Sequence, residues 1–136
     1  MSISRRDLLL AGGAFMLGGT ADAAFEAFKH LQFIACTTRE RQSADVQQLA
    51  GRLQSRQDTY TTRPYSLYGI VDRIGAGDAF AAGALHGLIS GFDAQKTIDF
   101  ATAAAVLKHS IPGDFNLGGV TDVELVLSEQ RTDVRR

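Results

Sequence analysis

The feature that most constrains the fold is a glycine turn that separates a short apolar run from an alanine-rich helix, over residues 71–80. Gly75 and Gly77 allow positive φ angles and a close approach of a ligand to the backbone. The helix predicted from Asp78 to Ser90 leaves its first N–H groups without intrahelical partners, at the positive end of its dipole. The sequence therefore predicts a binding site for a phosphate or another oxyanion at this turn.

Asp78 places a carboxylate in the first turn of that helix, beside a position suited to a second negative charge. Such a carboxylate can cap the helix by accepting a hydrogen bond from a backbone N–H. It can also accept the proton of a hydroxyl group that attacks a phosphoryl group. The residues alone leave both roles open.

Residues 72–83 read Asp-Arg-Ile-Gly-Ala-Gly-Asp-Ala-Phe-Ala-Ala-Gly. They resemble the D-T-x-G-A-G-D-x-F signature of the ribokinase-like (PfkB) sugar kinases, with Arg73 where threonine is commoner. Residues 107–116, which contain Ile-Pro-Gly-Asp-Phe-Asn, resemble a C-terminal segment of the 2-keto-3-deoxygluconate kinases in that family. The resemblance extends roughly from Asp22 to Leu127. It implies the C-terminal portion of a three-layer α/β/α ribokinase-like fold, present in incomplete form.

The resemblance also implies a reaction, in which ATP with Mg²⁺ phosphorylates a sugar acid. The expected acceptor is 2-keto-3-deoxygluconate, the expected product is its 6-phosphate, and the expected catalytic base is Asp78. The residues expected to form the anion hole for the transferred phosphate are Gly75, Ala76 and Gly77. The residues expected to contact the nucleotide are Ala104, Ala105, Lys108 and Asn116. No protein side chain is expected as a metal ligand.

Each of these nucleotide contacts has a plainer explanation. The small side chains of residues 101–105 suit helix packing, and Lys108 reads equally well as a solvated surface lysine. Asp114 and Asn116 offer oxygens to a water molecule or a cation, yet hydrogen bonds within a turn explain both residues without any ligand.

Composition and motifs exclude several other classes of function. The 136 residues are 45% hydrophobic with a formal net charge of -1, and the charges are interspersed, so no basic surface for nucleic acid is predicted. Cys36 is the only cysteine, which rules out an internal disulfide. No apolar run reaches the length of about 20 residues that a membrane-spanning helix needs. The P-loop and dinucleotide-binding patterns are absent, as are a His/Cys metal cluster and a G-x-S-x-G nucleophile motif.

The chain divides into an N-terminal segment (1–20), a sugar-kinase portion (21–130) and a polar tail (131–136). The segment from Ser4 resembles a twin-arginine export signal, with Arg5 and Arg6 before an apolar run. Against export, a kinase that uses ATP is expected in the cytoplasm. Both locations stay open.

Hydrophobic periodicity predicts a sheet covered on both faces and several helices. The small residues Gly83 and Gly87 predict a close backbone contact inside the helix after the glycine turn, whose apolar face is expected to include Leu85. Asp93 is the predicted cap of the next helix. The remaining predicted elements are a helix over 21–30, a strand over 31–37 with Cys36 buried, short strands and loops over 38–68, a strand ending at Ile70–Val71, and a final helix ending at Leu127.

The resemblance covers only part of such a kinase, so the sequence predicts poor or absent phosphate transfer by this chain alone. A non-catalytic nucleotide-binding remnant and a small exported protein are the competing interpretations. The expected small-molecule partners are a sugar acid and ATP. Strand edges left open would favour self-association.

Overall fold

The computed structural model describes residues 8–11, 18–41 and 46–133. Five strands and four helices follow one another in the order β1, α1, β2, β3, β4, β5, α2, α3, α4. The bounds of the strands are β1 Leu8–Ala11, β2 Phe33–Arg41, β3 Gln47–Gln54, β4 Thr59–Thr61 and β5 Tyr65–Leu67. The bounds of the helices are α1 Gly18–Ala27, α2 Ala76–Ile89, α3 Ala94–Lys108 and α4 Val120–Asp133.

The five strands form one sheet in the order β1-β2-β3-β4, with β5 also paired to β3. β1 runs parallel to β2, and the other pairs are antiparallel. β4 and β5 occupy the same edge of β3, because residues 59–61 pair with one half of β3 and residues 65–67 with the other half. Pro64 lies in the break between them, where it interrupts no ladder hydrogen bond.

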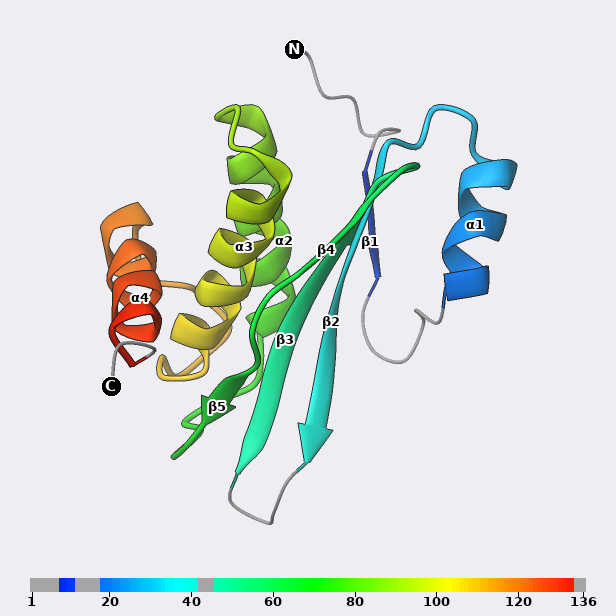
Figure 1. Ribbon diagram of the computed structural model, residues 1–136. Helices are drawn as coiled ribbons and strands as arrows, with labels where there is room; N and C mark the ends of the chain where they lie inside the picture. Colours follow the sequence, from blue (N-terminus) through cyan, green and yellow to red (C-terminus); the bar gives the residue numbers. More distant parts are fainter. Residues whose placement is uncertain (1–7, 12–17, 42–45, 134–136) are drawn as a thin grey trace.

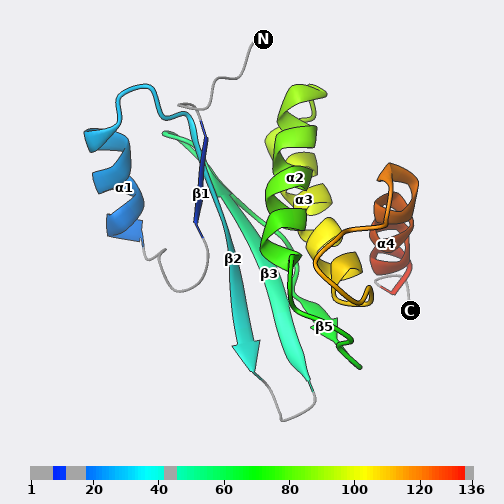
Figure 2. The same cartoon turned by 180° about the vertical axis from the view of Figure 1, so that it is seen from behind.

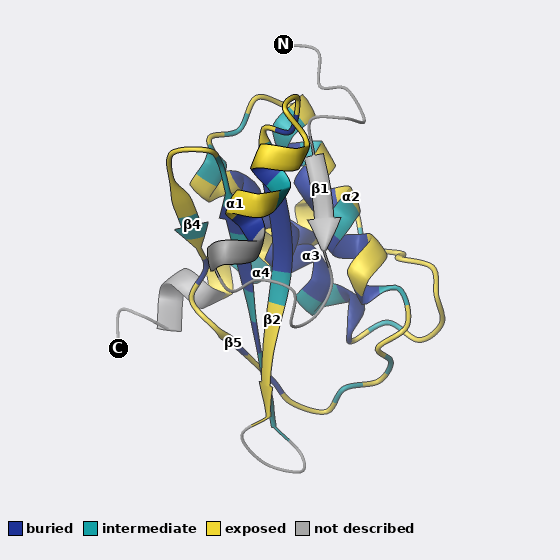
Figure 3. Cartoon of the chain, turned by 90° about the vertical axis from the view of Figure 1, so that its right-hand side faces the viewer, coloured by how far each residue is buried: buried dark blue, intermediate teal, exposed yellow. Residues whose placement is uncertain are grey.

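Helices cover both faces of the sheet, as predicted. α1 lies on one face, α2 and α3 lie on the other, and α4 packs outside α3 (Figures 1 and 2). Along β2 the side chains alternate, so that Ile34 and Cys36 pack with Phe25 of α1 whereas Ala35 joins the core under α2 and α3. The buried part of β2 gives way to an exposed end at Arg41 (Figure 3). This arrangement gives the three layers, α/β/α, that the resemblance implied.

The contact between α2 and α3 depends on two glycines that carry no side chain. A Cβ atom placed on Gly83 would lie 2.8 Å from the Cα of Ala101, and one on Gly87 would lie 2.9 Å from Thr97 Oγ1. The predicted close approach is therefore present, and the partner is the backbone of α3. It fixes the direction of α2, and with it the position of the glycine turn at the N-terminus of α2.

Local hydrogen bonds define where α3 and α4 begin. Asp93 caps α3 as predicted, since its Oδ1 accepts the N–H of Lys96 at 2.7 Å. In the first turn of α4, Asp122 Oδ2 accepts the N–H of Gly119 at 2.8 Å. α4 continues to Asp133, so the prediction that the last helix ends at Leu127 was wrong.

Two further predictions about local structure were wrong. The predicted strand at Ile70–Val71 is absent, because β5 ends at Leu67 and the chain then runs in irregular conformation to the glycine turn. Leu85 is exposed, whereas the buried face of α2 is formed by small residues and one phenylalanine. That face is Ala76, Ala79, Phe80, Gly83, Ala84 and Gly87.

The predicted export signal lies largely outside the described residues, which omit 1–7 and 12–17. None of the helices in the described ranges is long and apolar enough to cross a membrane. In the described part of the chain β1 pairs only with β2. Self-association through a sheet edge stays a prediction.

Replacing Gly83 with alanine tests the contact between α2 and α3. Because the new methyl group would collide with the backbone of Ala101, we expect the free energy of unfolding to fall by about 1–3 kcal/mol in urea titrations followed by circular dichroism. Gly77→Ala is the matched control in the same helix, since a Cβ there meets nothing within 4 Å. The control should leave stability unchanged or raise it by up to about 1 kcal/mol. Equal effects of the two changes would contradict the packing explanation.

Candidate active site

The glycine turn is built around Gly75, which adopts φ 77° and ψ -1° at the N-cap of α2. A non-glycine residue pays a conformational cost in this left-handed region. The carbonyl of Gly75 accepts the N–H of Ala79 at 2.9 Å, which starts the helix. A Cβ atom on Gly75 would also lie 2.5 Å from the main-chain oxygen of Asp114. Glycine is therefore required here both by the backbone angle and by the neighbouring loop.

The first turn of α2 presents free N–H groups to solvent. No side chain caps the helix. Within the described ranges, no acceptor lies within hydrogen-bond distance of the N–H groups of Gly77 and Asp78. The space beside Gly77 is open, because a Cβ there would meet nothing within 4 Å. An anion can approach these donors directly.

Asp78 lies in the first turn of α2, and its side chain is exposed. Among the described residues it forms no ion pair. The carboxylate therefore stands free in the same turn as these N–H groups, and its role as a base for a hydroxyl group stays a prediction.

Asp72 joins the glycine turn to the loop that follows α3. Its Oδ1 accepts the N–H of Ile74 at 3.0 Å, and its Oδ2 accepts the N–H of Gly113 at 2.9 Å. These hydrogen bonds from Ile74 and Gly113 are the main reason that the pKa of Asp72 lies below its usual value. The carboxylate thus holds two segments together that are 41 residues apart in sequence.

Lys108 holds the same loop from the other side. Its side chain is 0% exposed, and its Nζ donates to the carbonyls of Ile111 at 2.8 Å and Gly113 at 2.5 Å. The interpretation of Lys108 as a solvated surface lysine was therefore wrong. Contact between Lys108 and a nucleotide stays a prediction, and it would have to be made beside these two hydrogen bonds.

The other expected nucleotide residues lie at different depths. Ala104 is buried in a cluster with Val123 of α4, and its Cβ also faces Gly83 of α2. Ala105 is buried in the core under the sheet. Asn116 is exposed, and its Oδ1 accepts the N–H of Gly118 at 3.0 Å within a local turn. Nucleotide contact by these three residues stays a prediction.

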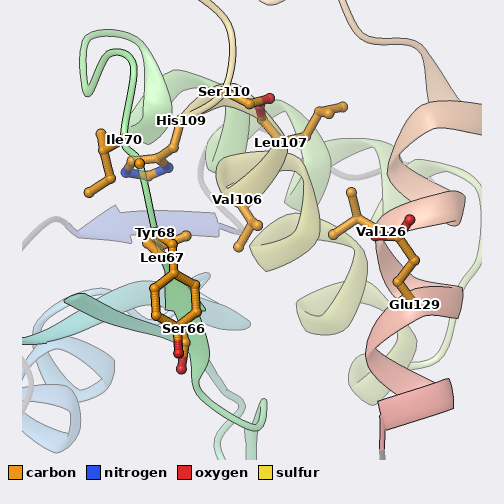
Figure 4. Close-up of a pocket in the computed structure, with 11 residues that line it drawn as sticks. Ser66, Leu67, Tyr68, Ile70, Val106, Leu107, His109, Ser110, Val126 and Glu129 are labelled. Atoms are coloured by element: carbon orange, nitrogen blue, oxygen red, sulfur yellow. The ribbon is translucent and has the colours of Figure 1, made fainter. Parts of the chain in front are cut away.

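A pocket of about 280 Å³ opens next to the glycine turn (Figure 4). Its walls come from the segment after β5, the C-terminal end of α3 and the outer helix α4. The lining residues are Ser66, Leu67, Tyr68, Gly69, Ile70, Val106, Leu107, His109, Ser110, Val126 and Glu129. Backbone hydrogen bonds join the pocket wall to the segment that leads into the turn. The carbonyl of His109 accepts the N–H groups of Val71 at 3.0 Å and Asp72 at 3.3 Å.

His109 is the one buried polar side chain in this lining, with 3% of its surface exposed. Its Nδ1 lies 2.6 Å from the carbonyl of Ala105, so Nδ1 carries the proton. In the described part of the chain, the buried Nε2 has no hydrogen-bond partner. Burial is the main cause that lowers the pKa of His109, and the positive charges of Arg39, Arg73 and Lys108 lower it further. Nε2 is therefore an unused acceptor at neutral pH.

Sequence reasoning missed this pocket. Tyr68 belongs to no motif, and the structure leaves this residue 72% exposed in the lining. His109 carried no motif of its own. A usable signal was that two polar residues, Lys108 and His109, directly follow the small and apolar run 103–107.

The described residues contain no group of three His, Cys, Asp or Glu side chains able to hold a metal ion. Asp78 and Asp114 carry exposed carboxylates on the two segments that Asp72 joins. Mg²⁺ is often bound by one or two carboxylates together with substrate phosphates, and these donors fit that mode.

The chain is similar to known carbohydrate kinases. The family model described as pfkB family carbohydrate kinase matches residues 55–114. No curated protein matches the chain at a significant level.

Among solved structures, the 2-dehydro-3-deoxygluconokinase of Thermotoga maritima is similar with 30% identity and a TM-score of 0.79, covering 90% of this chain and 42% of that one. A provisionally named 2-keto-3-deoxygluconate kinase of Enterococcus faecalis has 34% identity and a TM-score of 0.75, and the match covers 82% of this chain and 32% of that one. A provisionally named ribokinase II of Escherichia coli in complex with ATP and Mg²⁺ has 18% identity and a TM-score of 0.68, and the match covers 90% of this chain and 39% of that one.

The chain thus spans less than half the length of each of these structures. The third structure supports the fold alone, whereas the first two add sequence identity over most of this chain. The chain is a relative of the PfkB-family carbohydrate kinases and carries the C-terminal portion of their ribokinase-like fold.

Proposed function

We propose that this chain carries the nucleotide side of an ATP-dependent sugar-acid kinase, with 2-keto-3-deoxygluconate as the acceptor and its 6-phosphate as the product. The observation that carries the proposal is the free carboxylate of Asp78 beside the unpartnered N–H groups at the start of α2. The similarity to the Thermotoga maritima 2-dehydro-3-deoxygluconokinase, whose name denotes the same sugar acid, supports the choice of substrate.

In the proposed reaction, Asp78 accepts the proton of the primary hydroxyl group of the sugar acid. The hydroxyl oxygen forms a bond to the γ-phosphorus of ATP, the bond to the bridging oxygen breaks, and ADP leaves. Backbone donors in the turn from Gly75 through Ala76 to Gly77 stabilise the charge that spreads over the phosphoryl oxygens. The N–H of Gly77 is free for this role, whereas that of Ala76 donates to the carbonyl of Arg73 at 3.4 Å and would have to leave it. Because Gly75 is held by its own backbone angle and by the Asp114 loop, the free donor needs little reorganisation.

ATP with Mg²⁺ is the proposed cosubstrate, and the Escherichia coli structure solved with both supports this choice by fold. Mg²⁺ would be carried by the phosphates, within reach of an exposed carboxylate such as Asp114. Arg39 and Arg73 add positive charge to the same region, and each is close enough to His109 to lower its pKa. This charge favours a polyphosphate.

The pocket next to the turn is the proposed site of the adenine base. Tyr68 offers an exposed aromatic ring for stacking. His109 Nε2, buried and without a partner among the described residues, can accept a hydrogen bond from the exocyclic amine of the base. A base bound there would satisfy an acceptor that otherwise costs folding free energy.

The chain spans 42% of the Thermotoga maritima structure, so complete activity is part of the proposal and not of the comparison. Our expectation is that this chain alone transfers phosphate poorly or not at all. A second candidate function, a nucleotide-binding remnant without turnover, is favoured by the same coverage. ATP binding in calorimetry without release of ADP would select it.

Location remains a proposal as well. We expect a cytoplasmic protein because the reaction uses ATP, and the competing expectation is export through the twin-arginine-like segment. An N-terminus at Ala24 in mass spectrometry of the mature protein would select export.

The anion hole can be tested with Gly77→Ala. The new methyl group meets no protein atom, but it would enter the space beside the free N–H groups. We expect folding to be preserved and the affinity for ATP to fall by roughly tenfold or more, measured by calorimetry. Ala82→Ser, a change at an exposed position later in α2, is the control and should bind ATP normally. Unchanged affinity in Gly77→Ala would place the phosphates elsewhere.

The base site can be tested through the protonation of His109, with adenosine as a ligand that has no phosphate. Since the pKa of His109 is lowered, the neutral acceptor is fully present above its ordinary pKa of about 6.5 and is lost as pH falls through the lower value in the folded protein. We expect adenosine affinity to fall by about fivefold over that range, the equivalent of one hydrogen bond. His109→Gln keeps an acceptor but does not titrate, so its affinity should not vary with pH. The same pH dependence in both proteins would refute this role of His109.

The role of Asp78 can be tested with Asp78→Asn. Loss of a general base lowers turnover by about 10²–10⁴-fold, so whatever release of ADP depends on 2-keto-3-deoxygluconate should disappear, while ATP binding is retained. Asp58→Asn, a change of another exposed aspartate far along the chain, should have no effect. Sugar-dependent turnover that survives in Asp78→Asn would rule out the proposed base.

A further inference from the structure

The ammonium group of Lys108 has an unusual environment for a lysine. Lysine side chains are almost never fully buried unless they are paired, yet Lys108 is 0% exposed at the C-terminal end of α3. Its Nζ donates to two main-chain carbonyls, those of Ile111 and Gly113. The helix end adds a favourable interaction, because the C-terminal carbonyls form the negative end of the helix dipole.

A carboxylate lies near this ammonium group, although the two form no ion pair. Asp72 is close enough for the charge of Lys108 to stabilise its ionised form, after the larger contribution of its hydrogen bonds from Ile74 and Gly113. The N–H of Gly113 donates to Asp72, and the carbonyl of the same residue accepts from Lys108. One loop residue is thus held from both sides by opposite charges.

The side chain of Lys108 also lies against the glycine turn. A Cβ atom on Gly75 would lie 3.3 Å from Lys108 Cε and 2.5 Å from the main-chain oxygen of Asp114. The lysine stem, the loop from Ile111 to Asp114 and the turn therefore form one packed unit. Any movement of the ammonium group would release the loop that presses on Gly75, and with it the start of α2.

Main-chain carbonyls, the acceptors of the Lys108 ammonium group, are also the ligands that K⁺ channels offer to K⁺. We propose that Lys108 is a built-in monovalent cation, whose ammonium group occupies an oxygen-lined site and holds the Ile111–Asp114 loop against the glycine turn. Lys108 is then a positioning residue for the anion hole. The order of this loop needs no K⁺ from solution. The stability readout below does not rest on the proposed kinase function.

The test is chemical rescue of Lys108→Ala, which removes the ammonium group and leaves room for an ion. Melting temperatures are measured in KCl, NH₄Cl, NaCl and tetramethylammonium chloride at equal concentration. The wild type should melt at the same temperature in all four salts. The variant should melt about 10 °C or more lower in tetramethylammonium chloride, and should recover part of that loss in KCl or NH₄Cl.

Three controls make the result specific. Lys96→Ala removes an exposed lysine from the same helix and should show no salt-specific recovery. Lys108→Gln fills the site with a neutral donor, so it should lose stability without recovery in KCl. Binding of inorganic phosphate to Lys108→Ala should weaken and should return with K⁺, an effect that a purely structural loss would not give.

The inference is overturned if KCl and NH₄Cl do not raise the melting temperature of Lys108→Ala, or if they raise that of the wild type equally. If Lys108→Ala folds only when KCl or NH₄Cl is present, the inference is supported, and failure to fold in all four salts counts against it. Recovery by K⁺ in a chain that binds no ATP would leave this inference intact and reject the proposed function. ATP binding without recovery of the melting temperature by K⁺ would reject this inference and leave the proposed function intact.

Discussion

The structure around the candidate site depends on the contact between Gly75 and the main-chain oxygen of Asp114. This contact brings a turn at the start of α2 against a loop that follows α3. Only a residue without a side chain allows it, and Gly75 also adopts a left-handed backbone conformation that favours glycine. Asp72 and Lys108 hold the loop residue Gly113 from two sides, which keeps the loop against the glycine turn.

A second pair of glycines sets the frame in which that contact forms. Gly83 and Gly87 let α2 approach the backbone of α3 closely, and this packing directs the N-terminus of α2 toward the end of α3. Helix N-termini attract anions through aligned backbone dipoles, but only if they are open to solvent. Here the buried residues of α2 continue to Ala76, whereas Gly77 and Asp78 face outward. The residues to which we assign the proposed chemistry are thus the first exposed ones of this helix.

Charge near the site is divided between buried and exposed positions. Lys108 is buried with its charge stabilised by carbonyl oxygens, and Asp72 has its oxygens occupied by N–H donors. Both charges are used for structure. Asp78 has no such partner among the described residues, which leaves it free for proton transfer. His109 Nε2 is a comparable unused group in the neighbouring pocket.

The sequence by itself determined the glycine turn, the helix after it, the cap at Asp93 and the burial of Cys36, because these depend on backbone angles, side-chain size and short-range hydrogen bonds. It also pointed to Asp78, since residues close in sequence bring that carboxylate to the helix start. Only the tertiary structure decided the role of Lys108, the pocket with His109, the irregular course at Ile70–Val71 and the exposure of Leu85. Those depend on which distant segment covers each side chain, and a local pattern cannot tell a lysine in water from one held by carbonyls that a folded loop brings to it.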